Sequence, residues 1–197
     1  MKSSIKSIAV FCGSSAGSDP VYKKRAFALG QLLAKHSISI IYGGANIGLM
    51  GAVADGALSE GGKVIGVIPG FLKAHEIAHE NLSELIEVES MHERKLKMNE
   101  LCDGVIALPG GYGTFEELFE MITWAQLGLH HKPIGLLNIK GYYDPLLQMV
   151  SRMLHEGFLK KTNADMLLHD SEAQALIKQM QEDASPLSEK WIADNQT

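Results

Sequence analysis

The stretch Gly104-Val-Ile-Ala-Leu-Pro-Gly-Gly-Tyr-Gly-Thr-Phe-Glu-Glu117 places an apolar run, a glycine-rich loop and the start of a helix directly after one another. Gly104–Leu108 has the length and composition of a buried parallel strand. Pro109–Gly113 interrupts this run, and Thr114 can cap the helix that follows. Strand, turn and helix in this order form the repeating unit of an α/β fold.

The same unit recurs along the chain. The other expected strands are the apolar runs Ile5–Cys12, Ile38–Tyr42, Lys63–Ile68, Leu85–Val88 and Pro133–Ile139. The expected helices are Val21–His36, Leu49–Ser59, His92–Leu101, Thr114–Leu127, Pro145–His155 and Ser171–Gln181. Because strands and helices alternate, the connections are right-handed crossovers. The sequence therefore predicts a single α/β domain over residues 1–182, built on a doubly wound parallel sheet, and a polar C-terminal tail over residues 183–197.

The composition excludes several classes of protein. The 197 residues are 46% apolar and 21% charged, which is ordinary for a globular protein, and the net charge of −5 provides no overall positive field for nucleic acid or an anionic membrane. Cys12 and Cys102 each lie beside an apolar run, which favours reduced thiols over a disulfide framework. Ile8–Cys12 is too short for a signal-peptide core or a membrane span. We therefore expect a cytoplasmic protein with neither nucleic acid nor membrane as a partner.

Glycine clusters follow three of the expected strands: one contains Gly13 and Ser14, one contains Gly43 and Gly44, and one is Pro109–Gly113. In a parallel sheet the carboxyl ends of the strands share one edge, where ligands bind. Glycine lets the backbone approach a ligand and direct N–H groups at an anion, and the dipole of the next helix adds to this. One such cluster alone is more simply a tight turn. Three clusters at one edge favour a phosphate-bearing ligand.

Two motifs point to other chemistry. Gly13–Gly17 fits GxSxG, the nucleophile-elbow motif of serine hydrolases, in which Ser15 would be the nucleophile. The serine of a true nucleophile elbow is followed directly by a helix, whereas here Asp19 and Pro20 begin a separate helix. His75–His79 fits the zinc motif HExxH, yet its helical register is weak and no later residue is spaced as a third ligand. We therefore expect no metal.

Nucleotide motifs of the common kinds do not match. The sequence contains no GxxxxGKS/T stretch, and Gly44, Gly48 and Gly51 miss the GxGxxG spacing by one residue. No acidic residue closes the second expected strand, where a dinucleotide ribose would need one. An NAD-dependent enzyme is therefore not favoured.

Two charged residues interrupt an apolar stripe in the segment that begins at Met91. At 3.6 residues per turn, Arg94 and Lys95 lie on the same face as Met91, Met98, Leu101 and Cys102. A charge on an inward face is unfavourable unless it is paired or meets a ligand. Arg94 is therefore either a snorkelling side chain paired with a carboxylate or a clamp for an anionic substrate, which suits a planar guanidinium.

The helix after Thr114 is apolar on two sides. Phe115, Leu118, Phe119 and Ile122 form one face, and Glu117 lies opposite with Met121 and Trp124. A glutamate in a first turn is stabilised by the helix dipole, but a carboxylate flanked by apolar groups is also one whose pKa can be adapted to acid–base chemistry. The second apolar side predicts burial against a partner subunit.

These residues resemble a known family. Pro109-Gly110-Gly111-x-Gly113-Thr114-x-x-Glu117, preceded by Met91-x-x-Arg94-Lys95, is similar to the paired signature of the Lonely Guy family of cytokinin riboside 5′-monophosphate phosphoribohydrolases. The similarity covers about residues 5–180. It implies a Rossmann-like homodimer that hydrolyses the N-glycosidic bond of a nucleoside 5′-monophosphate, a cytokinin riboside 5′-monophosphate or AMP, to free base and ribose 5-phosphate. It also implies that no cofactor is required.

The resemblance assigns roles by position. Arg94 and Glu117 would be catalytic, and the substrate would be bound by Glu76, Arg94, Lys95, Gly111, Tyr112, Gly113, Thr114, Phe115, Glu116, Glu117 and Thr123. The turns at Gly13, Ser14, Gly43 and Gly44 are candidates for further phosphate or base contacts. Cleavage of the C1′–N bond builds positive charge on the ribose, and a nearby carboxylate either stabilises this charge or activates the attacking water. We assign this role to Glu117, with Glu116 as the reserve.

Two other functions have to be weighed. Members of this family were long labelled lysine decarboxylases, but such an enzyme would need pyridoxal phosphate on a Schiff-base lysine, and no lysine lies in a recognisable cofactor pocket. A non-catalytic protein that binds a nucleotide or a nucleotide-containing cofactor is the stronger alternative. The presence of Arg94 together with Glu117 favours the enzyme, because a carrier would not need both. The sequence leaves open whether an N6-prenylated adenine nucleotide or AMP is preferred.

Overall fold

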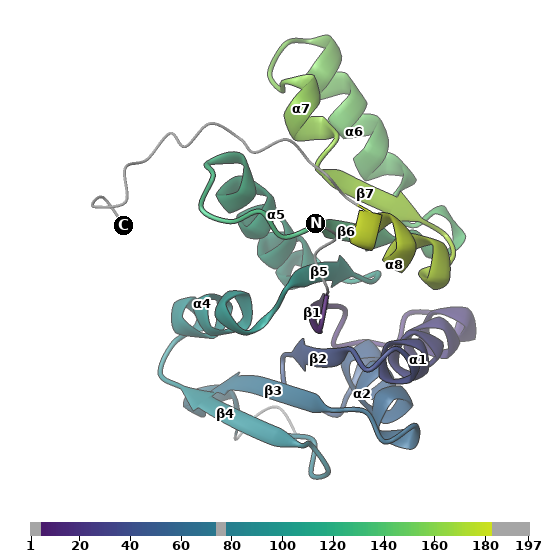
Figure 1. The fold of residues 1–197 in the computed structure, drawn as a ribbon, viewed down its shortest axis with the longest axis vertical. Coiled ribbons are helices and arrows are strands. Elements are labelled where there is room, and N and C mark those ends of the chain that lie inside the picture. Colours follow the sequence, from purple (N-terminus) through teal and green to yellow (C-terminus); the bar gives the residue numbers. More distant parts are fainter. Residues whose placement is uncertain (1–4, 74–77, 183–197) are drawn as a thin grey trace.

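A seven-stranded parallel sheet forms the centre of the molecule (Figure 1). The computed structural model describes residues 5–73 and 78–182, so the predicted tail at 183–197 lies outside the described residues. The strand order is β4-β3-β2-β1-β5-β6-β7. The strands are β1 (Ser7–Phe11), β2 (Ser39–Tyr42), β3 (Val64–Pro69), β4 (Glu84–Val88), β5 (Gly104–Ala107), β6 (Ile134–Leu137) and β7 (Leu167–Asp170).

The chain first extends the sheet from β1 to β4 and then returns to add β5 on the other side of β1. Val10 pairs with Ile106, and Phe11 pairs with Ala107, so β1 and β5 end side by side. In doubly wound sheets the point at which the strand order reverses is where ligands bind. The carboxyl ends of β1 and β5 are therefore the expected position of a site.

Helices cover both faces of the sheet (Figure 1). They are α1 (Pro20–Lys35), α2 (Gly48–Ser59), α3 (Gly70–Lys73), α4 (Met91–Leu101), α5 (Tyr112–Gln126), α6 (Asp144–His155), α7 (Lys161–Ala164) and α8 (Ala173–Glu182), with a short 3-10 turn η1 (Ile139–Gly141). Side chains alternate across β1: Ile8 and Val10 join the core beneath α1, α2 and α8, while Ala9 and Phe11 join the core beneath α4, α5 and α6. The predicted doubly wound α/β fold is thus confirmed.

The differences from the predicted elements have local causes. Strand β7 was not predicted, because only Leu167 of its four residues is fully buried and an edge strand lacks a continuous apolar run. Helix α5 begins at Tyr112, with Gly111 at its N-cap position and no side-chain cap. The prediction that Thr114 caps this helix is therefore wrong. Leu118 and Met121, predicted on opposite faces of α5, are both buried against the sheet, whereas Phe119 is 41% exposed.

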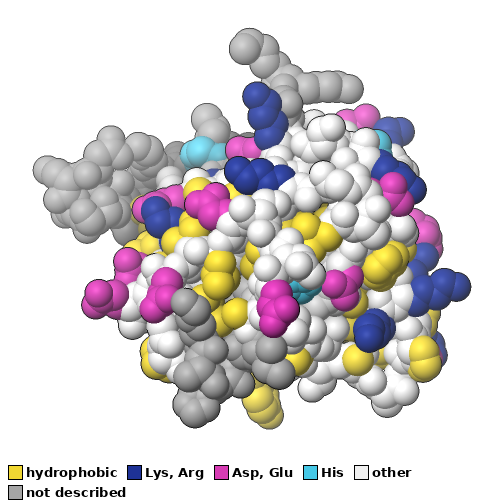
Figure 2. All heavy atoms as spheres, turned by 90° about the horizontal axis from the view of Figure 1, so that it is seen from below, with side chains coloured by type: hydrophobic (Ala, Val, Ile, Leu, Met, Phe, Trp, Pro, Cys, Tyr) yellow, Lys and Arg dark blue, Asp and Glu magenta, His cyan; other side chains and the backbone are white. Residues whose placement is uncertain are grey.

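The charged side chains of both signs are distributed over the surface. On the face shown in Figure 2, lysine and arginine side chains are interspersed with carboxylates rather than gathered into one basic patch. Among the residues with described structure, no helix is long and apolar enough to cross a membrane. Cys12 and Cys102 are both buried and unbridged, as expected.

Candidate active site

The three glycine turns meet at the switch point of the sheet. The N–H of Gly13 donates a hydrogen bond to the carbonyl of Pro109 at 3.1 Å, and the carbonyl of Gly13 accepts one from Leu49 at 3.0 Å. Gly48 has a φ of +58°, and a Cβ there would lie 2.3 Å from the Ser14 carbonyl group, so only glycine fits. The turn after β1 is therefore clamped between the turns after β2 and β5, and the predicted convergence is confirmed.

A cavity of about 310 Å³ lies at this point, which is within the size range of small-ligand sites. Predicted site residues that line it are Gly13, Ser14, Gly43, Arg94, Gly111, Tyr112, Gly113, Thr114 and Glu117. Residues that sequence reasoning did not select complete the lining: Val10, Cys12, Met50, Leu72, Met91 and Met98. Most of these are apolar, so the cavity combines charged and apolar lining residues.

Arg94 is a buried charged residue in the lining of the cavity. Ser90 begins α4 by accepting a hydrogen bond from the N–H of Glu93, which places Arg94 in the first turn. The side chain is only 6% exposed, and its Nε has no hydrogen-bond partner in the described part of the chain. A buried donor without a partner is unfavourable by about 1–3 kcal/mol, and more for a charged group. The guanidinium lies inside the cavity rather than snorkelling to solvent, which favours the predicted anion clamp.

Glu117 reaches the same cavity from α5. The pKa of the Cys12 thiol is affected by both Glu117 and Arg94. Burial raises this pKa far above the usual value, the negative charge of Glu117 raises it further, and the positive charge of Arg94 opposes the shift. Cys12 is therefore a neutral thiol near both groups and is no candidate nucleophile. The structure brings together the two residues predicted to be catalytic.

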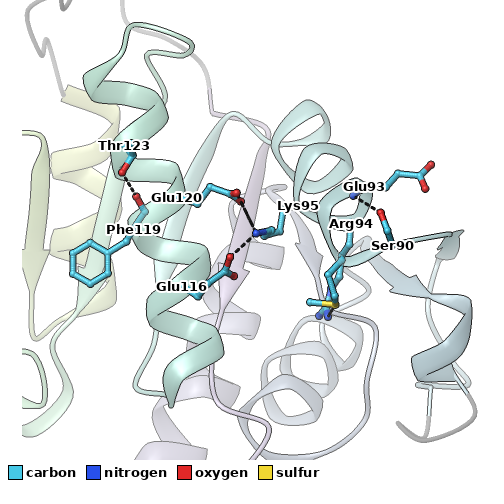
Figure 3. A network of polar contacts seen from close by, with 9 residues as sticks. Ser90, Glu93, Arg94, Lys95, Glu116, Phe119, Glu120 and Thr123 are labelled. Carbon is cyan, nitrogen blue, oxygen red and sulfur yellow. Dashed lines mark hydrogen bonds and ion pairs between the residues drawn. The ribbon is translucent and has the colours of Figure 1, made fainter. Parts of the chain in front are cut away.

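Lys95 and Glu116 pair with each other instead of lining the cavity. Figure 3 shows Lys95 reaching across to Glu116 and Glu120 of α5, while the Arg94 side chain extends in a different direction. The Nζ of Lys95 lies 2.5 Å from Glu116 Oε1 and 3.1 Å from Glu120 Oε2. Burial lowers the pKa of Lys95, but the hydrogen bonds and charges of the two glutamates outweigh it, and the net shift is upward. Lys95 thus ties α4 to α5.

The remaining predicted contacts lie elsewhere. Phe115 packs edge-to-face on Tyr143, with ring centroids 5.8 Å apart. Thr123 is exposed, and its Oγ1 donates a hydrogen bond to the carbonyl of Phe119 at 2.7 Å (Figure 3). Thr123 follows Thr114 by nine residues, which is about 14 Å along a helix, and it is not among the described residues that line the cavity. Glu76 lies outside the described residues.

His79, the second histidine of the HExxH match, has a polar contact at each of its ring nitrogens. His79 Nε2 lies 3.0 Å from Asp55 Oδ1, and Nδ1 accepts the N–H of Asn81 at 3.2 Å. His75 lies outside the described residues. Over residues 5–73 and 78–182, no group of three or more His, Cys, Asp or Glu side chains could hold a metal ion. His79 therefore anchors its segment to α2.

The geometry defines a class: a Rossmann-like α/β protein whose cavity combines a buried arginine, a carboxylate and an uncapped helix start. The family model described as "Possible lysine decarboxylase" matches residues 50–180. The cytokinin riboside 5′-monophosphate phosphoribohydrolase LOG1 of Arabidopsis thaliana is 47% identical over 190 residues, which cover 96% of this chain and 89% of LOG1. The probable cytokinin riboside 5′-monophosphate phosphoribohydrolase LOGL2 of Oryza sativa subsp. japonica is 43% identical, and the alignment covers 98% of this chain and 79% of LOGL2. The chain belongs to the Lonely Guy family of phosphoribohydrolases.

Solved structures share the fold at lower identity. The molybdenum cofactor binding protein of Rippkaea orientalis aligns with a TM-score of 0.67 and 24% identity, over 89% of this chain and 95% of its own. The molybdenum cofactor carrier protein of Chlamydomonas reinhardtii aligns with a TM-score of 0.66 and 20% identity, over 90% of this chain and 98% of its own. At these identities the likeness concerns the fold alone.

The words "lysine decarboxylase" in the description of the family model imply pyridoxal phosphate, which the cavity does not fit. None of the described residues that line it is a lysine, so these residues supply no Schiff-base partner. The cavity is instead lined by an arginine, a carboxylate and the glycine-rich start of α5.

Proposed function

We propose that this protein hydrolyses the N-glycosidic bond of nucleoside 5′-monophosphates to free base and ribose 5-phosphate. The observation that carries the proposal is that the buried Arg94 and the half-buried Glu117 line one cavity at the switch point of the sheet. The curated relatives, which are 43–47% identical, are named for this activity on cytokinin riboside 5′-monophosphates.

The start of α5 supplies the phosphate site in this proposal. Gly111 is the N-cap residue and no side chain covers the first N–H groups of the helix. Such N–H groups and the positive end of the helix dipole bind phosphate well. A 5′-phosphate at Gly111–Thr114 places the ribose next to Glu117, which lies one turn further along the same helix.

Glu117 and Arg94 then act on the sugar and the leaving base. As the C1′–N bond breaks, its electron pair passes to the base, and the positive charge that develops on the ribose is stabilised by the Glu117 carboxylate. Glu117 takes a proton from the water that attacks C1′, and the departing base takes up a proton. Arg94 holds the substrate through its open donor and supports departure of the base.

The apolar lining residues of the cavity bear on the choice of base. Met50, Leu72, Met91 and Met98 line it. Methionine adapts its shape to irregular apolar groups. This wall favours a purine that carries an apolar N6 substituent, as in the cytokinin nucleotides for which the relatives are named, over unsubstituted AMP.

A second copy of the chain completes the proposed assembly. Phe119 and Thr123 are exposed on one face of α5, and none of the twelve residues of α6 is fully buried, although Met149 and Leu154 are apolar. An amphipathic helix without a buried residue suits a subunit interface.

Light scattering is expected to give a dimer for the wild type and a monomer for Phe119→Asp. A monomeric wild type would contradict the homodimer.

The catalytic proposal is tested by base release from isopentenyladenosine 5′-monophosphate, followed by HPLC. Glu117→Gln and Arg94→Ala are expected to lose at least about a hundredfold in kcat/KM, because each removes a charge that acts in the transition state. Glu100→Gln, an exposed carboxylate paired with Lys97, is the matched control and is expected to keep wild-type activity. Full activity in Glu117→Gln would contradict the mechanism. Saturable nucleotide binding without base release by the wild type would favour the non-catalytic alternative.

A further inference from the structure

Two tyrosines that follow β6 hold the glycine loop that follows β5. Tyr143 Oη donates a hydrogen bond to the carbonyl oxygen of Leu108 at 2.6 Å, and Tyr142 Oη donates one to the carbonyl oxygen of Gly110 at 2.5 Å. Neither tyrosine is among the described residues that line the cavity. Their hydroxyl groups therefore act on the backbone of the loop and not on a ligand.

Aromatic packing fixes the position of the Tyr142 ring. It meets the ring of Tyr143 edge-to-face at a centroid distance of 5.2 Å and the ring of Tyr22 at 6.2 Å. Tyr143 is fully buried and also meets Phe115. Contacts of this geometry are favourable and restrict rotation of the rings. The hydroxyl of Tyr142 is thus held at the loop by its neighbours.

The hydrogen bond from Tyr142 sets the direction of one peptide group. In a trans peptide the C=O and the following N–H point in opposite directions, and no cis peptide occurs in the described part of the chain. Because the carbonyl of Gly110 points to Tyr142, the N–H of Gly111 points to the other side. Gly111 lines the cavity, and a Cβ on it would meet no atom within 4 Å, so the space around it is open.

We propose that Tyr142 is a positioning residue that aims the Gly111 N–H at the phosphate group of the ligand. Tyr143 differs, because the peptide between Leu108 and Pro109 has no N–H to aim. Its hydrogen bond stabilises the loop without directing a donor. The proposal rests on the proposed function for the identity of the ligand, a sugar phosphate monoester.

The test is the binding of ribose 5-phosphate, measured by calorimetry on the full chain. Tyr142→Phe keeps the ring packing and removes only the hydroxyl group; it is expected to raise the Kd about fivefold, the effect of losing one oriented hydrogen bond. Tyr22→Phe removes a hydroxyl group from the same aromatic cluster and is the matched control, expected to leave the Kd within twofold. With nucleotide substrate, Tyr142→Phe is expected to raise KM by the same factor and to leave kcat within twofold.

Three results with the variants would overturn the proposal: an unchanged Kd in Tyr142→Phe, an equal change in Tyr22→Phe, or a loss confined to kcat. A merely structural role would lower the melting temperature without this selective loss of phosphate affinity. Absence of ribose 5-phosphate binding by the wild type would also overturn it. A wild type that binds ribose 5-phosphate but releases no base would refute the proposed function, and the effect of Tyr142→Phe on binding would still decide the role of Tyr142.

Discussion

Gly43→Ala tests whether the position of the Arg94 side chain matters for activity. A Cβ on Gly43 would lie 2.1 Å from Arg94 Nη2, 3.3 Å from Arg94 Cζ and 3.0 Å from Met50 Sδ. Gly43 is not among the glycines with positive φ, so alanine fits the backbone without strain. The guanidinium group must therefore retreat by more than about 1 Å to reach a normal contact distance.

A displacement of this size has a predictable effect on the reaction. Misplacing a catalytic group by about 1 Å lowers the rate on the order of a hundredfold, which corresponds to about 2.7 kcal/mol of transition-state stabilisation. We expect kcat/KM for base release from isopentenyladenosine 5′-monophosphate to fall by about this factor in Gly43→Ala. Urea unfolding is expected to show a folded protein with a cooperative transition.

Arg94→Ala provides the control for this prediction. When the guanidinium group is absent, the added methyl group presses only on the flexible end of the Met50 side chain, which can adapt. Gly43→Ala is therefore expected to change kcat/KM by less than about threefold in the Arg94→Ala background. The affinity for ribose 5-phosphate is the second measurement: Gly43→Ala is expected to lower it in the wild-type background and to leave it nearly unchanged in the Arg94→Ala background. Wild-type activity in Gly43→Ala, or an equal loss in both backgrounds, would refute the reasoning.

Three further predictions concern contacts of buried polar side chains. Lys95→Met removes a largely buried ion-paired group and is expected to lower the free energy of unfolding in urea by about 1–2 kcal/mol. Lys97→Met, on the exposed side of the same helix, is the control and is expected to change it by less than about 0.5 kcal/mol. Equal effects of the two substitutions would contradict the contact between α4 and α5. Tyr143→Phe leaves the Leu108 carbonyl without its buried donor and is expected to lower the free energy of unfolding by about 1–2 kcal/mol, with no loss counting against the bond. Burial lowers the pKa of His130 to about 4, so below its unfolded pKa of about 6.5 the unfolded state binds a proton that the folded state does not. The free energy of unfolding therefore falls by up to about 3 kcal/mol between pH 6.5 and pH 4. His130→Gln is expected to reduce this dependence on pH, and an unchanged dependence would refute the prediction.

The parts of the fold that could be predicted are those whose signals are local. Buried strands such as β1 and β5 are short apolar runs, and the glycine turns after them follow directly in the sequence. Arg94 could be identified because it interrupts an apolar stripe. The edge strand β7 carries no such signal, because most of its side chains are not fully buried.

Other features depend on which elements become neighbours in space. Lys95 shares its predicted stripe with Arg94, but the sequence does not show that Glu116 and Glu120 of α5 face it. Tyr142 is 32 residues from the Gly110 carbonyl that it holds. Thr114 has the right chemistry for a cap, yet α5 starts two residues earlier because Gly111 takes the N-cap position.

The most direct test of the central claim compares phosphorylated and unphosphorylated substrates with the wild-type protein. Free base is measured by HPLC after incubation with isopentenyladenosine 5′-monophosphate, AMP and the two corresponding nucleosides. Because the open start of α5 is assigned to the 5′-phosphate, base release is expected from the nucleotides, with the prenylated nucleotide preferred, and at least about a hundredfold less from the nucleosides. Equal release from nucleotides and nucleosides, or release from neither, would contradict the account.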